Sequence, residues 1–472
     1  MAEGGINAAL NTKDENDSPE EHFTDTIKAA CGLADPNAVW GMTQAAPELV
    51  HWLLKLGVKF NMSGYDDVDL RNFGGQKKKR TAFAQSDTGK QIMTAMIDAV
   101  RRKEASGMVE RFSHHSFLTL RLCGNICCGC VIRDEYSQET VELPGDAVIV
   151  ATGGMHGLFG NTTGSLSNTG EVTAELFRLG VPLANGEMIQ YHPTTVKCGG
   201  KRMLISEAAR GEGGRLFAMK DGKQWYFMEE KYPELGNLMP RDITAREIWK
   251  VSHESEVFLD MTEISEEIIS NKLSGLADDC MTYLHKDIRK EPVSVLPGIH
   301  YFMGGILVDE QHRTPIQNLY AAGECCAQYH GANRLGGNSL LGALYGGRVA
   351  AKSACEQADV VDLSCATQID FPPTSQISEI KQLNKVMQET MGVVRNENTL
   401  LNGIQTVQAL TGNLPLLGMA VLKSALARKE SRGAHWREDY PKSNDDDYLK
   451  TTVARFDGKQ IQISFVPVPE RR

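Results

Sequence analysis

The spacing of hydrophobic residues predicts several helices in the first hundred residues of the chain. Apolar positions recur at helical intervals over 39–56 and again over 86–102. Ser18 followed by Pro19 is typical of an N-cap and a first helical position, because the serine oxygen can accept a backbone N–H and proline lacks one. Pro47 is expected near the start of a helix, since proline disrupts a helix interior.

Strand-like patterns follow these helices. Residues 107–150 alternate between apolar and polar positions, which predicts a β-meander with a turn near Gly124 and Asn125. Residues 146–154, with the sequence DAVIVATGG, predict a short buried strand that ends in glycines. Residues 371–432 return to helical periodicity around a pair of prolines. Helices and strands therefore mix along the chain, and an α/β fold is expected.

The stretch 300–346 combines features that suit a bound ligand. A short strand-like run over 318–322 ends in Gly323, and a glycine-rich loop leads into an apolar helix that is expected to open at Asn338. Glycine at such a junction lets the backbone approach a flat or phosphorylated ligand, and the helix start offers unpaired N–H groups. Arg334 lies within the loop, and its forked guanidinium suits a carboxylate. The stretch therefore predicts a cofactor cradle beside an anion clamp.

Composition narrows the class of protein. The chain has 472 residues, 41% hydrophobic and 23% charged, which is ordinary for a soluble globular protein of about three domains. Its net charge of -10 argues against a nucleic-acid partner. No signal peptide and no apolar run of about 18 residues is visible, so a cytoplasmic location is expected, with membrane contact only through partner subunits. Eleven cysteines are expected to be reduced thiols.

Two clusters in the sequence favour plain structural interpretations. The cysteines at 123, 127, 128 and 130 have a spacing that matches no standard zinc or iron–sulfur pattern, so an ordinary hairpin is preferred and no metal site is predicted. The basic run 77–80, KKKR, is more typical of a solvated loop than of a docking patch for an acidic partner.

Several residues could carry chemistry, although each is a weak signal alone. His192 precedes a proline, and a His-Pro dipeptide is often only a turn. Glu207 and Arg210 lie three residues apart, close enough to pair on a helix or turn. Arg241 by itself would be the first residue of an ordinary helix. Their order along the chain is what makes them informative.

Taken in order, these segments resemble the succinate dehydrogenase/fumarate reductase flavoprotein family, which also includes L-aspartate oxidase. The resemblance covers almost the whole chain. It rests on QYHPTT, SEAARGEGG, MPRDITAR, HYFMGG, AAGE, GANRLGGNSLL and SRGAHWREDYP.

The resemblance implies roles for individual residues. Arg241 takes the place of the family's proton donor or acceptor, with Glu207 and Arg210 as the relay behind it. A C4 dicarboxylate would be held by four further residues, two for each carboxylate. They are Arg334 with His300 and His192 with Ser206, where Ser206 stands in place of the family's threonine.

The implied cofactor is FAD, bound non-covalently. The segment AEGGINAAL at the start resembles one that lies well inside the family's FAD domain, and the chain contains no GxGxxG loop and no histidine that would attach FAD covalently. We therefore expect an N-terminally truncated chain that lacks the first βαβ unit. The residues expected at the cofactor are Gly4, Gly5, Asn7, Glu171, Glu324, Ser339 and Leu340.

The resemblance also implies an architecture. It is a Rossmann-like FAD-binding domain with an inserted α+β capping domain, followed by a helical domain and a small C-terminal domain. The expected ranges are 1–187 and 299–368 for the FAD-binding domain, 188–298 for the capping domain, 369–432 for the helical domain and 433–472 for the C-terminal domain.

The expected activity is the interconversion of succinate and fumarate by hydride transfer to or from FAD, with electrons passed to an iron–sulfur subunit and with membrane anchor subunits as further partners. Two alternatives stay open. One is L-aspartate oxidase activity, and the other is a truncated, inactive flavoprotein. The sequence does not fix the direction of the reaction, because both directions use the same residues.

Overall fold

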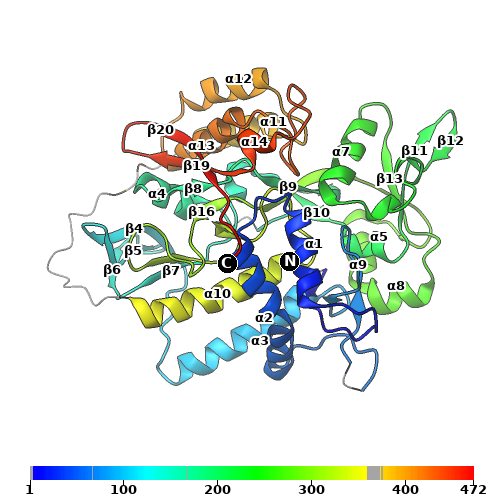
Figure 1. The fold of residues 1–472 in the computed structure, drawn as a ribbon, viewed down its shortest axis with the longest axis horizontal. Coiled ribbons are helices and arrows are strands. Elements are labelled where there is room, and N and C mark those ends of the chain that lie inside the picture. Colours follow the sequence, from blue (N-terminus) through cyan, green and yellow to red (C-terminus); the bar gives the residue numbers. More distant parts are fainter. Residues whose placement is uncertain (1–3, 66, 166, 359–370, 372, 374–375) are drawn as a thin grey trace.

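The computed structural model describes residues 4–65, 67–165, 167–358, 371, 373 and 376–472. Figure 1 shows the N-terminal helices with α10 below, a mixed region carrying α5 to α9 on one side, the strands β4 to β7 on the other side, and the helices α11 to α13 with the C-terminal strands above. The content is mixed α and β, as the sequence predicts. None of the described helices is long and apolar enough to cross a lipid bilayer.

The first N-terminal helix begins at its predicted cap, whereas the second does not begin at the proline where a helix start was expected. Helix α1 (Pro19–Ala29) begins after Ser18, whose side chain accepts a hydrogen bond from the Glu21 N–H at 3.2 Å. Helix α2 (Pro36–Leu56) contains Pro47 in its interior, so the expectation of a helix start there was wrong. A continuous buried face of α2 packs in the N-terminal core, and this tertiary packing outweighs the local cost of proline.

The predicted meander is present as the antiparallel sheet β4-β5-β6. Its turn lies at Gly124 and Asn125, between the first two strands, as expected. Cys123 is disulfide-bonded, so the expectation that every cysteine is reduced was wrong. The strands are β4 (His115–Cys123), β5 (Ile126–Asp134) and β6 (Thr140–Pro144).

A parallel pair of strands leads to the cofactor motifs. Strand β7 (Val148–Val150) pairs in parallel with β17 (Leu319–Ala321), and helix α10 (Asn338–Gln357) packs against both. The predicted start of α10 at residue 338 is confirmed. The prediction of a buried β7 was wrong in part, since Ile149 is 41% exposed. Within the described residues β7 pairs only with β17, so it is an edge strand rather than the central strand that complete burial requires.

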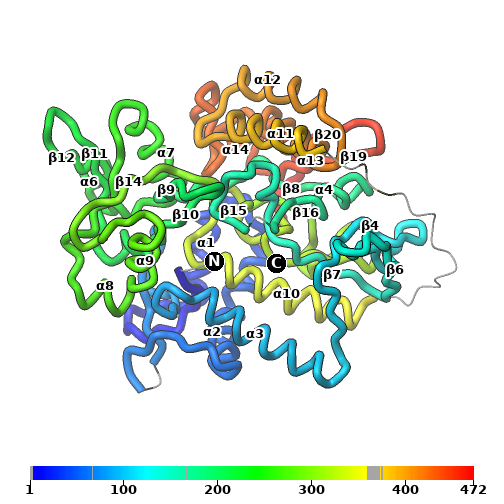
Figure 2. Tube along the Cα trace, turned by 180° about the vertical axis from the view of Figure 1, so that it is seen from behind, coloured from blue at the N-terminus to red at the C-terminus, as the bar shows by residue number. Residues whose placement is uncertain are grey.

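The three helices α2, α3 and α10 form the lower layer of the molecule. Helix α3 (Thr88–Ala105) contacts α2, and α2 contacts α10, which Figure 2 shows from behind. A small antiparallel sheet beside them connects the first residues to a later loop. Its strands are β1 (Ile6–Asn7), β3 (Thr81–Ala82) and β2 (Leu70–Arg71), in that order.

The mixed region contains two antiparallel sheets and several helices, the α+β content expected for a capping domain. One sheet has the order β10-β9-β15 and the other β12-β11-β13-β14. The strands are β9 (Ile189–Cys198), β10 (Lys201–Leu204), β11 (Arg215–Lys220), β12 (Lys223–Trp225), β13 (Val257–Asp260), β14 (Val293–Ser294) and β15 (Leu296–Phe302). The helices are α5 (Glu207–Gly211), α6 (Phe227–Lys231), α7 (Arg241–Val251), α8 (Glu266–Lys272) and α9 (Ser274–Asp279).

The last region confirms the helical periodicity that follows the prolines. Helices α11, α12 and α13 share one apolar core with α4, and the C-terminal hairpin β19-β20 completes a five-stranded sheet of order β18-β16-β8-β19-β20. The domain boundaries stay predictions, and the one at 368/369 lies outside the described residues. The elements are α4 (Glu171–Arg178), α11 (Ile377–Thr390), α12 (Glu397–Val407), α13 (Asn413–Ala427), α14 (Asp445–Tyr448), β8 (Leu183–Ala184), β16 (Gly305–Leu307), β18 (Cys326–Ala327), β19 (Lys450–Phe456) and β20 (Ile461–Pro467).

Candidate functional site

Two neighbouring strands bring a pair of histidines together. His192 on β9 and His300 on β15 come from antiparallel partners, and their rings meet edge to face with centroids 5.1 Å apart. His192 is 1% exposed, whereas His300 is only half-buried. Burial, followed by the positive charge of Arg241, holds the pKa of both imidazoles well below its usual value. Both rings are therefore neutral near pH 7.

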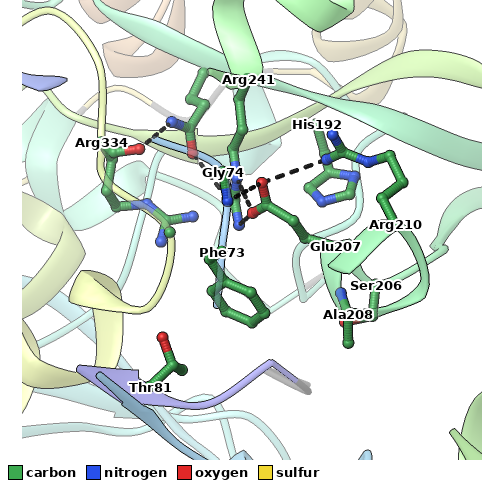
Figure 3. Close-up of polar contacts among 12 residues, drawn as sticks. Phe73, Gly74, Thr81, His192, Ser206, Glu207, Ala208, Arg210, Arg241 and Arg334 are labelled. Carbon is green, nitrogen blue, oxygen red and sulfur yellow. Dashed lines mark hydrogen bonds and ion pairs between the residues drawn. The ribbon is translucent and has the colours of Figure 1, made fainter. Parts of the chain in front are cut away.

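A buried carboxylate forms the centre of the site. Glu207 is the first residue of α5, and its Oε2 accepts from Arg241 Nη2 at 2.6 Å and from Arg241 Nε at 2.8 Å. Its Oε1 lies 3.4 Å from Arg210 Nη2 and accepts the Gly74 N–H at 3.2 Å. Figure 3 shows Glu207 between the two guanidinium groups. The sequence-based pairing of Glu207 with Arg210 is confirmed.

The two arginines also settle the charge of this carboxylate. Burial alone would raise the pKa of Glu207, but the positive charges of Arg241 and Arg210 outweigh it and hold the pKa below its usual value. Two glycines permit the close packing: a Cβ at Gly74 would lie 2.6 Å from Glu207 Oε1, and one at Gly336 would lie 2.9 Å from Oε2. Glu207 is therefore an ionised acceptor held in one position.

Arg241 is the first residue of α7, as its proline-preceded sequence suggested. It is 6% exposed, and its Nη1 donates to Gln190 Oε1 at 3.1 Å. The amide nitrogen of Gln190 in turn donates to the Arg334 carbonyl and to Asn333 Oδ1, both at 2.9 Å. Gln190 thus connects Arg241 to the loop that carries Arg334.

Arg334 is buried in this glycine-rich loop and pairs with no carboxylate of the described residues. It is 3% exposed, its guanidinium carbon lies 4.2 Å from the centre of the Tyr301 ring, and its Nε has no hydrogen-bond partner. Burial, followed by the positive charge of Arg241, lowers the pKa of Arg334 to about 9. A buried cation with an unused donor is an anion-binding feature.

The net charge of the cluster decides what it can bind. The buried guanidinium groups of Arg210 and Arg241 contact the single carboxylate of Glu207, a third buried guanidinium, that of Arg334, pairs with no carboxylate of the described residues, and the two histidines are neutral. The excess positive charge, with donors on several sides, suits a small dianion, and Arg241 is held by Glu207 where it could exchange a proton with one. The structure brings together six of the seven residues predicted at the substrate, and they are His192, Glu207, Arg210, Arg241, His300 and Arg334.

Ser206 also caps a helix, a structural role that the sequence did not suggest. It is the N-cap of α5, and its oxygen accepts the Ala208 N–H at 3.4 Å. The residue is 4% exposed and adjoins Glu207. Its hydroxyl hydrogen is still available as a donor, because the cap uses only a lone pair. Its contact with a substrate carboxylate stays a prediction.

The glycines predicted at the cofactor bring the backbone close to its neighbours. A Cβ at Gly4 would lie 2.7 Å from the Phe73 ring, and one at Gly5, where φ is +140°, would lie 2.5 Å from the Ala82 carbonyl. Asn7 is fully buried, and its amide nitrogen donates to the Gly336 carbonyl at 2.7 Å. The side chain of Asn7 is therefore bonded to the loop that carries Arg334 and helps to hold that loop in place.

The remaining cofactor candidates lie in two places. Glu324 Oε1 accepts the Phe302 N–H at 3.0 Å and lies 3.5 Å from His156 Nε2. Glu171 is exposed and does not join the arginine cluster. It lines a cavity of about 210 Å³ that His156 also borders. His156 therefore contacts one of these acids, Glu324, and shares a cavity with the other, Glu171.

These residues fit FAD by the chemistry of their donors and acceptors. The half-buried Ser339 and Leu340 lie in the first turn of the 20-residue helix α10, where N–H groups lack helical partners and could meet flavin carbonyl oxygens. The Glu324 carboxylate could accept hydrogen bonds from hydroxyl groups of the sugar chain of FAD. A Cβ at Gly154 would lie 2.6 Å from Glu324 Oε1, so the glycine leaves this carboxylate accessible.

Sequence reasoning missed three contributors to the site. Gln190 could have been found, because strand alternation puts it on the same face of β9 as His192. Gly74 and Thr163 gave no local signal: they contact Glu207 and His300 across 133 and 137 residues of chain.

The comparisons with known proteins agree with this geometry. A family model described as FAD binding domain matches residues 1–340, and one described as fumarate reductase flavoprotein C-term matches residues 410–471. The chain is 37% identical to the succinate dehydrogenase flavoprotein subunit of Bacillus subtilis, over 100% of this chain and 91% of that protein. It is 32% identical to L-aspartate oxidase of a Nostoc species, over 96% of this chain and 86% of that protein.

A solved structure supports the fold directly. The FrdA chain of Escherichia coli quinol fumarate reductase superposes with a TM-score of 0.89 at 27% sequence identity, and the match covers 99% of this chain and 89% of that chain. The matches confirm the predicted architecture type, and they confirm FAD as the cofactor.

Proposed function

This chain belongs to the succinate dehydrogenase/fumarate reductase flavoprotein family, and on that premise we propose that it interconverts succinate and fumarate. The observation that carries the proposal is the excess of buried positive charge: Arg210 and Arg241 share one carboxylate, Glu207, and the buried Arg334 pairs with no carboxylate of the described residues. A C4 dicarboxylate brings the two negative charges that such a site lacks.

Two groups of donors would bind the two carboxylates. Arg334, with its free Nε, and His300 on the neighbouring strand would hold one of them. His192 and the Ser206 hydroxyl would hold the other. Neutral histidines suit this task, because each can donate one hydrogen bond without adding a proton that the reaction must remove. Fixed donors at both ends would position the bond between the two central carbons.

Arg241 would transfer the proton at one central carbon. An arginine is a weak acid, with an ordinary pKa above about 12, so it needs a fixed position and a route for its proton. Glu207 supplies both, since its Oε2 contacts Nε and Nη2 of Arg241, and its Oε1 faces Arg210. FAD, when bound, supplies the exchange of hydride at the other carbon.

Electrons would leave the protein through an iron–sulfur subunit. The support is indirect: the Bacillus subtilis relative is named as a flavoprotein subunit, and the FrdA structure is part of a quinol fumarate reductase. We propose membrane anchor subunits as further partners and a cytoplasmic location, peripheral to the membrane through those partners.

L-aspartate oxidase activity is the second candidate function, because the Nostoc enzyme of that name is 32% identical over 96% of this chain. Aspartate has an amino group where succinate has a hydrogen, so the two substrates differ in charge at one carbon. The arrangement of arginines favours succinate over aspartate, since the cationic amine of aspartate would lie among like charges.

The test is a visible absorption spectrum of the purified chain with added FAD, before and after anaerobic addition of succinate, and separately of L-aspartate. We expect a flavin band that succinate bleaches and fumarate restores, with no bleaching of the matched Arg241→Gln variant. Bleaching by aspartate alone would move the assignment to L-aspartate oxidase. A protein that retains no flavin even with excess FAD would refute the activity of this chain and favour the inactive flavoprotein.

A further inference from the structure

One hydrogen bond at the site has two possible directions with different chemical consequences. The His300 Nδ1 lies 2.8 Å from Thr163 Oγ1, and both atoms can either donate or accept. Thr163 lies in the loop between β7 and α4, and its backbone N–H donates to the Ile299 carbonyl at 3.0 Å. This second bond fixes the threonine beside the histidine.

A neutral imidazole carries one N–H, so the direction of this bond decides which nitrogen has the hydrogen. If Nδ1 donates to Thr163, then Nε2 of His300 is a bare lone pair. If the Thr163 hydroxyl donates to Nδ1, then Nε2 carries the hydrogen. No described residue pairs with His300 Nε2, and the half-buried ring leaves it for a ligand.

The acceptors around the hydroxyl favour the second direction. Apart from His300 Nδ1, the acceptor that the described residues place within reach of Thr163 Oγ1 is the Ile299 carbonyl, at 3.4 Å rather than 2.8 Å. That carbonyl already receives the Thr163 backbone N–H. A hydroxyl donates best at the shorter distance, and the 3.4 Å contact is at the outer limit of hydrogen bonding.

We propose that Thr163 is a positioning residue that holds His300 as the Nε2–H tautomer, so that His300 presents a hydrogen-bond donor to a substrate carboxylate. The bare-nitrogen tautomer would instead face the carboxylate with a lone pair. The part of the proposal that concerns the substrate rests on the proposed function, whereas the tautomer itself does not.

The neighbouring histidine shows what this contact adds. His192 Nδ1 lies 3.1 Å from the Thr194 carbonyl and 3.3 Å from the Thr194 N–H, while the Thr194 hydroxyl donates to the Ile205 carbonyl at 2.8 Å. A carbonyl and an N–H at nearly equal distances leave the tautomer of His192 undetermined by its neighbours. The Thr194 hydroxyl also lies 3.4 Å from His192 Nδ1, at the outer limit of hydrogen bonding, whereas the Thr163 hydroxyl lies 2.8 Å from His300 Nδ1.

The tautomer can be read without any activity. In the full chain with FAD added and with ¹⁵N-labelled histidine, long-range ¹H–¹⁵N spectra separate protonated from bare ring nitrogens, and the His300→Gln variant assigns the signals. We expect His300 to show Nε2–H in the wild type and in Thr163→Ser. In Thr163→Val, which keeps the shape but loses the hydroxyl, we expect a mixture with Nδ1–H.

Binding then tests the consequence. By calorimetry, fumarate should bind Thr163→Val roughly tenfold more weakly than wild type, a typical loss for one hydrogen bond to a charged group, while Thr163→Ser binds normally. A wild type with Nδ1–H, or a Thr163→Val variant with an unchanged tautomer, overturns the proposal. If Thr163→Val does not fold, the wild-type spectrum still decides. A wild type that shows Nε2–H yet binds no fumarate contradicts the proposed function alone.

Discussion

Two clusters of buried arginines in this protein differ in how their charge is balanced. The first, called here the site cluster, consists of Arg210, Arg241 and Arg334 around Glu207. The second lies between α13 and the C-terminal strands and is called here the C-terminal network. In it, arginines and acids alternate, and its members are Arg428, Arg432, Arg437, Glu187, Glu430, Asp439 and Asp445.

The C-terminal network contains four carboxylates for three arginines, so each of its arginines has an acidic partner. Arg428 is fully buried, and its Nε and Nη1 lie 2.7 Å from Glu187 and Glu430 respectively. Its Nη2 donates to the Lys450 carbonyl at 2.6 Å and to Thr452 Oγ1 at 2.7 Å, so all three nitrogens have partners. Such an arrangement connects segments of the fold and has no excess positive charge to offer an anion.

The site cluster has the opposite character. Its guanidinium groups outnumber its carboxylates, and the Nε atoms of Arg210 and Arg334 have no hydrogen-bond partner in the part of the chain that the structure describes. Burying an unmatched charge costs several kcal/mol, so it is expected where a ligand supplies the missing partner. Because the arginines are buried in both clusters, the excess of positive charge and the unused donors are what distinguish the binding site from the structural ion network.

The largest effect should come from Arg241, the residue of the site cluster that we propose transfers the proton. We expect Arg241→Lys to lower kcat for succinate oxidation by about 10³–10⁴-fold, because lysine keeps the charge but loses the forked contact with Glu207. The measurement is steady-state turnover with an artificial electron acceptor.

The matched control is Arg246→Lys, on the same helix, where Arg246 stacks on Trp436 at 4.0 Å and is outside the cluster. It should keep kcat within about threefold, since a surface-type stacking contact contributes roughly 1 kcal/mol or less. Equal losses in both variants would mean that α7 tolerates no change and that Arg241 has no special role.

The second effect should appear in stability rather than activity. We expect Arg428→Met to lower the free energy of unfolding by about 3–5 kcal/mol, because it leaves Glu187 and Glu430 buried without their shared partner. Urea unfolding followed by tryptophan fluorescence measures it. The control Arg348→Met breaks an exposed pair with Glu48 and should cost less than about 1 kcal/mol. A loss in Arg428→Met no larger than this control would contradict the structural role.

The third effect is a pH dependence confined to the site cluster. With a pKa of about 9, Arg334 is a cation below that pH and loses its charge above it. Fumarate should therefore bind tightest below pH 9, and its Kd should rise by up to tenfold per pH unit above, the slope expected for loss of one proton. Calorimetry across this range measures Kd.

Arg334→Gln is the matched control for that titration. Glutamine carries no titrating charge, so its Kd should already be raised at pH 7 and should stay flat through pH 9. A wild-type Kd that is also flat to pH 10.5 would show that Arg334 keeps its proton and that burial is offset by another group.

The sequence predicted local features of the fold well where a short-range rule applies. Ser18 caps α1 and α10 begins at Asn338, because capping and helix-start chemistry depend on a few adjacent residues. Pro47 was misread because tertiary packing of α2 decides the outcome there. Ile149 was misread because burial of a strand depends on what covers it, which the strand's own residues do not encode.

The same distinction holds for the candidate site: some of its features could be predicted from the sequence and others could not. The charged and imidazole groups could be identified from motifs in order along the chain, and Glu207 with Arg210 from helical spacing alone. The contacts that set their direction could not. The Gly74 N–H that holds Glu207 and the hydroxyl that meets His300 both come from loops more than 130 residues away, and only the folded chain brings them together.

The smallest effect concerns Ser206, which has a structural role as a helix cap and also adjoins the site cluster. Ser206→Ala removes the hydroxyl donor, and we expect a 3–10-fold higher KM for succinate, the equivalent of roughly 0.5–1.5 kcal/mol for one hydrogen bond. Ser206→Thr keeps both the cap and the donor and should match wild type. Thermal unfolding separates the two tasks, because Ser206→Asn also caps the helix but changes the donor. If KM follows unfolding temperature across the three variants, Ser206 acts only as a cap. If KM rises in Ser206→Ala and Ser206→Asn while only Ser206→Ala is destabilised, the hydroxyl contacts the substrate, and the excess donors of the site extend beyond its arginines.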